Sequence, residues 1–86
     1  MSVTTATVRY FAGARAAAGV SEETVGFPAG STVADALSEL SGRHGEALSR
    51  VLLASSFLLD GVAVRDRSVP LSDGTVLDVL PPFAGG

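Results

Sequence analysis

"STVADALSELSGRHG", residues 31–45, is the segment of this sequence with the clearest helical signals. Thr32 stands at an N-cap position, Asp35 follows three residues later as in a capping box, and Gly45 is placed to end the helix. The apolar residues recur at helical spacing and form one stripe: Val33, Ala36, Leu37 and Leu40. A helix with one apolar stripe must pack against another element, so the rest of the chain has to supply that surface.

The residues before this helix predict two strands. TATVRYF (5–11) is rich in β-branched and aromatic residues, and EETVGFP (22–28) alternates in the same way until Pro28 ends it. Between them, the alanine-rich segment 12–19 predicts a short, partly helical connection that stops at Gly19. We expect the two strands to form a loose hairpin. The first strand has two alternating faces, one with Ala6, Val8 and Tyr10 and the other with Thr5, Thr7, Arg9 and Phe11.

The residues after the helix predict further short elements. Segment 46–55 is expected to add a helical turn. The stretch 56–64 predicts two short strands around Asp60-Gly61, because Asp-Gly is a strong signal for a two-residue hairpin turn. A second Asp-Gly pair precedes the final predicted strand, residues 75–80.

The predicted order of elements is therefore strand, strand, helix, strand, strand. One amphipathic helix covers only one side of a sheet, so the economical packing is an α+β fold in which one main helix lies on one face of a mixed sheet. This arrangement is typical of the β-grasp, or ubiquitin-like, architecture. We expect a β-grasp domain over residues 1–80 and a flexible C-terminal Gly-Gly tail over residues 81–86.

The composition excludes several classes of function. Cysteine and lysine are absent, so thiol chemistry, a Schiff base and a P-loop lysine are all unavailable, and His44 has no second histidine with which to hold a metal. A net charge of -3 with dispersed arginines argues against nucleic-acid binding. No apolar run is long enough to span a membrane, and the start, MSVTTATVRY, does not resemble a signal peptide. We expect a cytoplasmic protein that is not itself an enzyme.

The residues of the predicted tail suggest how it could enter a partner and react. Pro81 and Pro82 end the last strand and make its exit stiff, and residues 82–86 reach at most about 17 Å beyond the body. After Phe83 only small side chains remain, so the end of the chain could enter a narrow channel. The terminal carboxylate of Gly86 is ionised and is a poor electrophile until it is activated, for example as an acyl-adenylate. This chain has no phosphate-binding loop, so another protein must perform the activation.

Three stretches, VRYFAGAR (8–15), STVADALSEL (31–40) and PLSDGTVLDVLPPFAGG (70–86), resemble the MoaD/ThiS family of sulfur carriers, and within it the small subunits of molybdopterin synthases. The resemblance implies that an E1-like enzyme adenylates Gly86 with ATP and that a sulfur donor converts it to a thiocarboxylate. It implies that the large subunit of molybdopterin synthase then uses this sulfur, and that any catalytic activity belongs to that complex. No bound cofactor is implied. The tail inserted into the partner would comprise Pro81, Pro82, Phe83, Ala84 and Gly85.

A docking surface follows from the alternation of the strands. If the helix covers Val8 and Tyr10, then Phe11, Val76 and Leu80 lie on the uncovered face beside the tail exit. We expect partners to dock on these three residues, with Arg15 as a charged contact at the rim. The alternative is that segment 46–55 covers them and that they belong to the core.

Other interpretations remain open. The same tail would suit a carrier for thiazole or cysteine synthesis, a ubiquitin-like modifier joined to a target lysine, or an interaction module whose tail has no role. His44 is most simply a favourable residue at a helix end or a solvated side chain. The pair Glu22-Glu23 is most simply a pair of solvated charges.

Overall fold

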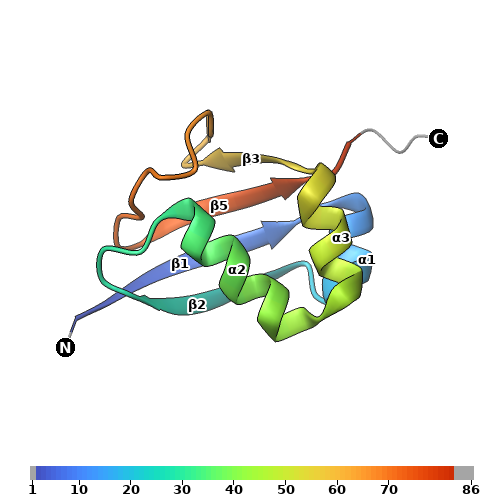
Figure 1. The fold of residues 1–86 in the computed structure, drawn as a ribbon, viewed down its shortest axis with the longest axis horizontal. Helices are drawn as coiled ribbons and strands as arrows, with labels where there is room; N and C mark the ends of the chain where they lie inside the picture. The colour runs from blue at the N-terminus through green and yellow to red at the C-terminus, as the bar shows by residue number, and fades with distance from the viewer. Residues whose placement is uncertain (1, 83–86) are drawn as a thin grey trace.

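The computed structural model describes residues 2–82 of the chain. Within these residues, eight elements follow one another: β1 (Val3–Tyr10), α1 (Ala12–Ala18), β2 (Glu22–Pro28), α2 (Val33–His44), α3 (Glu46–Ala54), β3 (Ser56–Leu59), β4 (Val62–Ala63) and β5 (Thr75–Leu80). Figure 1 labels each of them except the short β4. The predicted strand, strand, helix, strand, strand order is confirmed for the longer elements.

The five strands form one mixed sheet in the order β2-β1-β5-β3-β4. β1 and β5 pair in parallel, although they come from opposite ends of the chain, and the other neighbouring strands pair antiparallel. The predicted hairpin of the first two strands is present as β1 and β2. The strand that leads into the tail therefore lies at the centre of the sheet.

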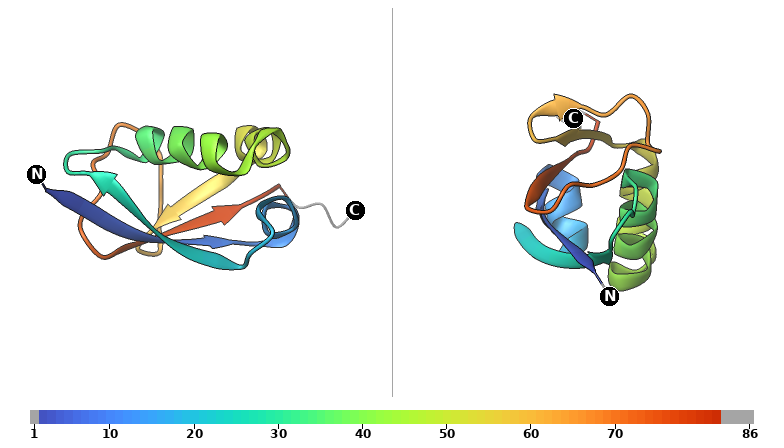
Figure 2. Two further views of the ribbon diagram at one scale, coloured as in Figure 1. Left: turned by 90° about the horizontal axis from the view of Figure 1, so that it is seen from below. Right: turned by 90° about the vertical axis from the view of Figure 1, so that its left-hand side faces the viewer.

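The helices leave one face of the sheet open. In Figure 2, α2 and α3 lie across one face, and α1 sits at the end of the sheet where β1 and β5 finish. The core fills the space between sheet and helices, and it includes the predicted inward face of β1, namely Ala6, Val8 and Tyr10, which are at most 2% exposed. The predicted helical stripe of Val33, Ala36, Leu37 and Leu40 is buried as well.

Local signals account for the ends of α2. The Thr32 hydroxyl accepts a hydrogen bond from the Asp35 backbone N–H at 3.2 Å, and the Asp35 carboxylate accepts one from the Thr32 N–H at 2.9 Å. This is the predicted capping box. Gly45 ends the helix with a φ of 86°, a backbone conformation that favours glycine.

Two segments are more helical than predicted. Segment 12–19 contains the seven-residue helix α1, and segment 46–55 contains the nine-residue helix α3 instead of one added turn. Leu48 and Leu52 of α3 lie one turn apart and are both buried in the core. Their burial stabilises a helix too short to be stable alone, because most helical stability in proteins comes from packing of the apolar side.

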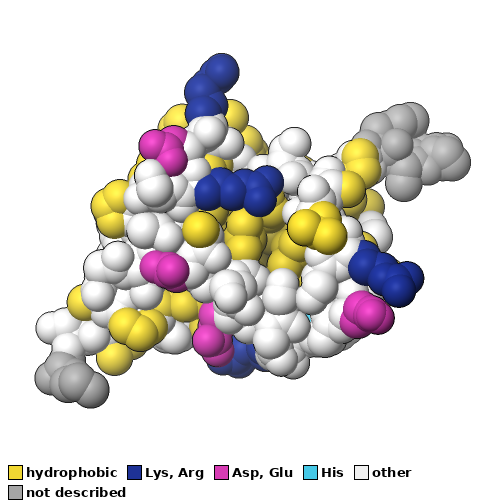
Figure 3. Space-filling model, viewed as in Figure 1, with side chains coloured by type: hydrophobic (Ala, Val, Ile, Leu, Met, Phe, Trp, Pro, Cys, Tyr) yellow, Lys and Arg dark blue, Asp and Glu magenta, His cyan; other side chains and the backbone are white. Residues whose placement is uncertain are grey.

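The helix side of the molecule carries interspersed charges. Figure 3 shows basic and acidic side chains scattered over this side, with apolar atoms visible between them. Leu53 of α3 is 83% exposed. Scattered single apolar residues are ordinary on protein surfaces.

Candidate functional site

The predicted functional tail follows directly from the central strand. β5 ends at Leu80, Pro81 is half-buried and Pro82 is exposed. The last strand residue is therefore beside the C-terminal end of β1, with which β5 runs in parallel. Four predicted tail residues lie outside the described residues, and their roles stay predictions: Phe83, Ala84, Gly85 and Gly86.

β1 and β5 present alternate residues to the open face of the sheet. Their parallel register pairs Thr7 with Val76 and Arg9 with Asp78. The intervening residues of β5, Leu77 and Val79, are fully buried on the helix side. The alternation predicted for the last strand is therefore confirmed, and Val76 and Leu80 share the open face.

The predicted docking residues lie around the tail exit. Phe11 is 39% exposed and is the N-cap of α1, and its backbone N–H donates to the Val79 carbonyl at 3.3 Å. Val76 and Leu80 are half-buried. Arg15 is exposed and lies one helical turn beyond Phe11, since its backbone N–H donates to the Phe11 carbonyl.

The alternative in which segment 46–55 covers these residues is wrong. Helix α3 lies on the same side of the sheet as α2 (Figure 2), and its buried residues belong to the core on that side. Phe11, Val76 and Leu80 stay at least partly accessible. They are therefore available to a partner.

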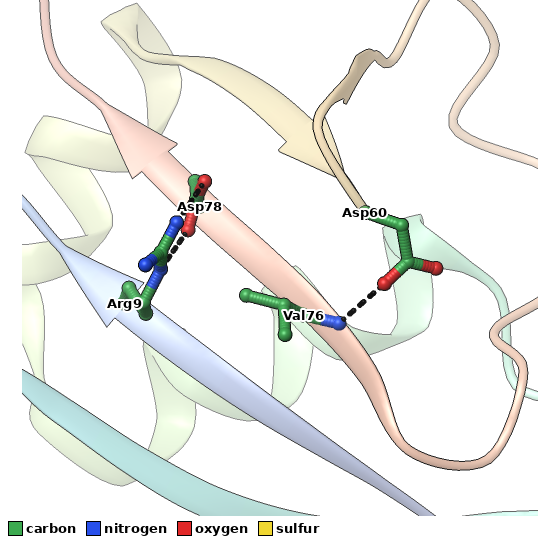
Figure 4. Close-up of polar contacts among 4 residues, drawn as sticks. All are labelled: Arg9, Asp60, Val76 and Asp78. Atoms are coloured by element: carbon green, nitrogen blue, oxygen red, sulfur yellow. Dashed lines mark hydrogen bonds and ion pairs between the residues drawn. The ribbon is translucent and has the colours of Figure 1, made fainter.

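An ion pair crosses the centre of the open face. The Arg9 Nε donates to Asp78 Oδ1 at 2.6 Å and Nη2 donates to Oδ2 at 2.9 Å (Figure 4). The hydrogen bond and the negative charge of Asp78 raise the pKa of Arg9 above its ordinary value. The guanidinium carbon also lies 5.7 Å from the centre of the Phe11 ring, within cation–π range. Alternation along β1 predicted the face on which Arg9 lies, but the sequence did not predict its contact with Asp78.

The turn between β3 and β4 is fastened to β5. The Asp60 carboxylate accepts hydrogen bonds from the Val76 backbone N–H at 2.9 Å and from the Thr75 hydroxyl at 2.6 Å (Figure 4). These two bonds lower the pKa of Asp60, so it is anionic at neutral pH. A shallow depression on the open face is lined by Thr7, Arg9, Glu22, Asp60, Gly61, Val76 and Asp78.

A second polar cluster lies on the helix side and contains Glu23 and His44. Glu23 accepts a hydrogen bond from the Tyr10 hydroxyl at 2.6 Å and contacts His44 Nε2 at 2.5 Å. The Glu23 side chain is only 18% exposed, so it is not the solvated charge that the sequence predicts. The His44 side chain is 15% exposed and lies in the last turn of α2, which confirms the helix-end alternative and rules out the solvated one. Partial burial opposes ionisation of Glu23, but the bonds from Tyr10 and His44 outweigh it and lower the pKa of Glu23. The cluster joins β1, β2 and α2.

Two further kinds of site can be assessed in the described residues, metal sites and membrane-spanning helices. Across residues 2–82 there is no group of three or more His, Cys, Asp or Glu side chains that could hold a metal ion. No described helix is both long and apolar enough to cross a bilayer. The open face beside the tail exit, which carries Phe11, Val76 and Leu80, is the candidate functional site.

Known proteins resemble this chain in sequence, and solved structures resemble it in fold. A family model described as the ThiS family matches residues 8–86. The molybdopterin synthase sulfur carrier subunit of Chlamydomonas reinhardtii is 35% identical over 80 residues, which cover 92% of this chain and 95% of that protein.

Among solved structures, a putative molybdopterin converting factor subunit 1 from Pyrococcus furiosus superposes with a TM-score of 0.84 and 31% identity, covering 93% of this chain and 99% of that one. Small archaeal modifier protein 1 of H. volcanii gives 0.81 and 28%, with coverage of 93% and 99%. A complex of subunits 1 and 2 of the molybdopterin-converting factor from Helicobacter pylori gives 0.67 and 25%, with coverage of 96% and 100%. These neighbours confirm the β-grasp fold, and the chain belongs to the ThiS family of MoaD/ThiS proteins.

Proposed function

We propose that this chain is a sulfur carrier whose terminal Gly86 is converted to a thiocarboxylate that donates sulfur for molybdopterin synthesis. The observation that carries the proposal is the family match, which runs through residue 86 and includes a relative named as a molybdopterin synthase sulfur carrier subunit. The central position of β5 supports it, because the tail follows a strand that is paired on both sides.

The proposed chemistry takes place on the terminal carboxylate and needs a partner enzyme. A carboxylate oxygen of Gly86 attacks the α-phosphate of ATP, and pyrophosphate leaves. A sulfide equivalent from a sulfur donor then attacks the acyl carbon, and AMP leaves with the carboxyl oxygen that joined it to phosphorus. An E1-like enzyme would bind the ATP, because this chain has no phosphate-binding loop. The carrier presents the reacting group and binds no cofactor of its own.

The proposed partners dock on the open face. The Helicobacter pylori structure is a complex of two converting-factor subunits, which supports a large-subunit partner for the present chain. Phe11, Val76 and Leu80 would form the apolar contact and Arg15 its charged rim, with the tail entering the partner's active site. Phe11 is the most accessible of the apolar three and should be the most sensitive to substitution.

The test of the carrier chemistry is the intact mass of the protein from its own host, with fragmentation of the C-terminal peptide. We expect a mass gain equal to the exchange of one oxygen for one sulfur, located on Gly86. A tail that remains a free carboxylate after incubation with ATP, the activating enzyme and a sulfur donor would refute the proposal.

The test of the docking face is Phe11→Asp, measured by calorimetric titration with the large subunit. The variant should fold normally and bind at least about tenfold more weakly, because loss of a central aromatic anchor commonly costs this much. Leu53→Asp is the matched control, because it also replaces an exposed apolar residue by aspartate but does so on the helix side. Equal weakening by both variants would count against the open face.

A second candidate function is covalent attachment to other proteins. The likeness to small archaeal modifier protein 1 favours it. Gly86 would then form an isopeptide bond with a target lysine, and the chain could not be linked to itself in this way because it contains no lysine. Higher-mass conjugates that carry the Gly86 remnant on lysine, absent when Gly86 is deleted, would identify this function.

A further inference from the structure

The Arg9–Asp78 ion pair stands beside the apolar residues of the proposed docking face. Arg9 is 47% exposed at its side chain, whereas its partner Asp78 is only 6% exposed. Asp78 binds the side edge of the guanidinium, formed by Nε and Nη2. The contact therefore holds Arg9 in one orientation on the sheet surface (Figure 4).

The remaining donors of Arg9 form a second binding edge. A guanidinium has five N–H groups, and the two bonds to Asp78 use one on Nε and one on Nη2. The other Nη2–H and one Nη1–H are parallel and form a fork at the end of the side chain. Water can satisfy them while Arg9 is half-exposed. A docked protein would remove that water, and buried donors without acceptors are costly.

The surrounding charges decide which acceptor suits this edge. Glu22 is the register partner of Arg9 on β2, Asp78 is its ion-pair partner, and Asp60 lines the same depression. Three carboxylates and one guanidinium thus line this part of the face, so a further carboxylate would meet a surface with net negative charge. A carbonyl oxygen accepts hydrogen bonds without adding charge. It also requires little additional desolvation compared with an ion.

We propose that Arg9, positioned by Asp78, is a specificity-determining residue of the docking face and binds carbonyl oxygen atoms of the partner protein. The inference rests on the proposed function, because it assumes that a partner covers this face. The partner it describes has an apolar surface for Phe11 and Leu80 and, beside it, backbone or amide carbonyl groups directed at Arg9. A partner with only apolar groups at that point would leave the fork unsatisfied.

The test measures, by calorimetric titration, how tightly variants of this chain bind the large subunit. Arg9→Leu/Asp78→Leu removes both charges together, so neither is left unpaired. It should bind at least about tenfold more weakly than the wild type, because hydrogen bonds from a charged donor are lost. Arg9→Lys keeps the charge but loses the fork, and it should also bind more weakly. Thermal unfolding verifies that each variant is folded. If Arg9→Leu/Asp78→Leu is unstable, Arg9→Gln/Asp78→Asn takes its place in the titration.

Three results would overturn the inference. The first is a double variant that binds as tightly as the wild type. The second is an Arg9→Lys variant with wild-type affinity, which would show that charge alone suffices. The third is a difference in affinity between the wild type and the double variant that is present at low salt and disappears at high salt. Such salt dependence would indicate that Arg9 binds a carboxylate of the partner.

The same titrations separate this inference from the docking proposal. If Phe11→Asp weakens binding and the double variant does not, the docking face is correct and the role of Arg9 is wrong. If Phe11→Asp also binds normally, the docking face itself is wrong, whatever Arg9 does.

Discussion

Glu23 shows how one residue can be misread when its spatial neighbours are unknown. In the sequence it stands beside Glu22 at the start of a strand, where a solvated charge is the ordinary expectation. Its side chain instead points to the helix side, because alternation along β2 gives the two glutamates opposite faces. There it contacts Tyr10 and His44, which come from two other elements.

We predict that Glu23→Gln lowers the free energy of unfolding at pH 7 by about 1–3 kcal/mol, the usual range for a disturbed buried polar group. Folding lowers the pKa of Glu23. Its stabilisation is therefore complete above the unfolded pKa of about 4.3 and is lost as the pH falls through the lower folded value. The difference from the wild type should shrink between about pH 5 and pH 3 in urea titrations.

The exposed Glu39 of α2 offers a matched control for this prediction. Glu39→Gln should leave the free energy of unfolding within about 0.5 kcal/mol of the wild type at pH 7. A Glu23→Gln effect that stayed constant with pH would mean that shape, and not ionisation of Glu23, accounts for it.

At the scale of elements, the β3–β4 hairpin connects local sequence to the docking face. Asp60 and Gly61 have φ angles of 50° and 83°, as a type I′ turn requires at its two central residues. The Asp60 carboxylate also binds the backbone of Val76, so the turn holds the outer strands against the central one. The Asp-Gly signal thus predicted the turn, whereas the contact with β5 depends on the sheet order.

We predict that Gly61→Ala destabilises the protein by about 1–2 kcal/mol, because a side chain at positive φ is strained. Gly42→Ala is the matched control. Gly42 lies within α2, and an added Cβ would meet no atom within 4 Å. This change should stabilise the protein by about 0.5–1 kcal/mol. Thermal unfolding of both variants measures the effects, and the same sign for both would contradict the structural account.

At the scale of the whole molecule, the parallel pairing of β1 and β5 places the first and the last strand of the chain side by side in the middle of the sheet. This arrangement brings Phe11, at the end of β1, next to the exit of the tail. It also separates the fold from the proposed chemistry, because β5 ends at Leu80 and the proposed reactive residue is Gly86.

We predict that deletion of residues 85–86 leaves the melting temperature unchanged and abolishes acceptance of sulfur. Val79→Ala is the control for the sensitivity of the unfolding assay. Val79 is fully buried, and its truncation should cost about 2 kcal/mol. A truncated protein that melted well below the wild type would show that the terminal glycines contribute to the fold.

Features that depend on residues close together in the chain could be predicted from the amino-acid sequence. The capping box of Thr32 and Asp35, the apolar stripe of α2, the Asp60-Gly61 turn and the faces of the strands were all predicted correctly. Each follows from side-chain periodicity, a short-range hydrogen bond or the φ preference of one residue. Phe11, Val76 and Leu80 could be placed on the open face for the same reason.

The tertiary structure alone decided which elements are neighbours. The Arg9–Asp78 ion pair joins residues 69 positions apart, and Glu23 meets His44 across 21 positions. Alternation along a strand gives the face of each residue but not the strand that lies next to it. The full length of α3 likewise required burial of Leu48 and Leu52 against distant parts of the chain. These contacts were not predictable locally, because their free energy comes from long-range pairing and packing.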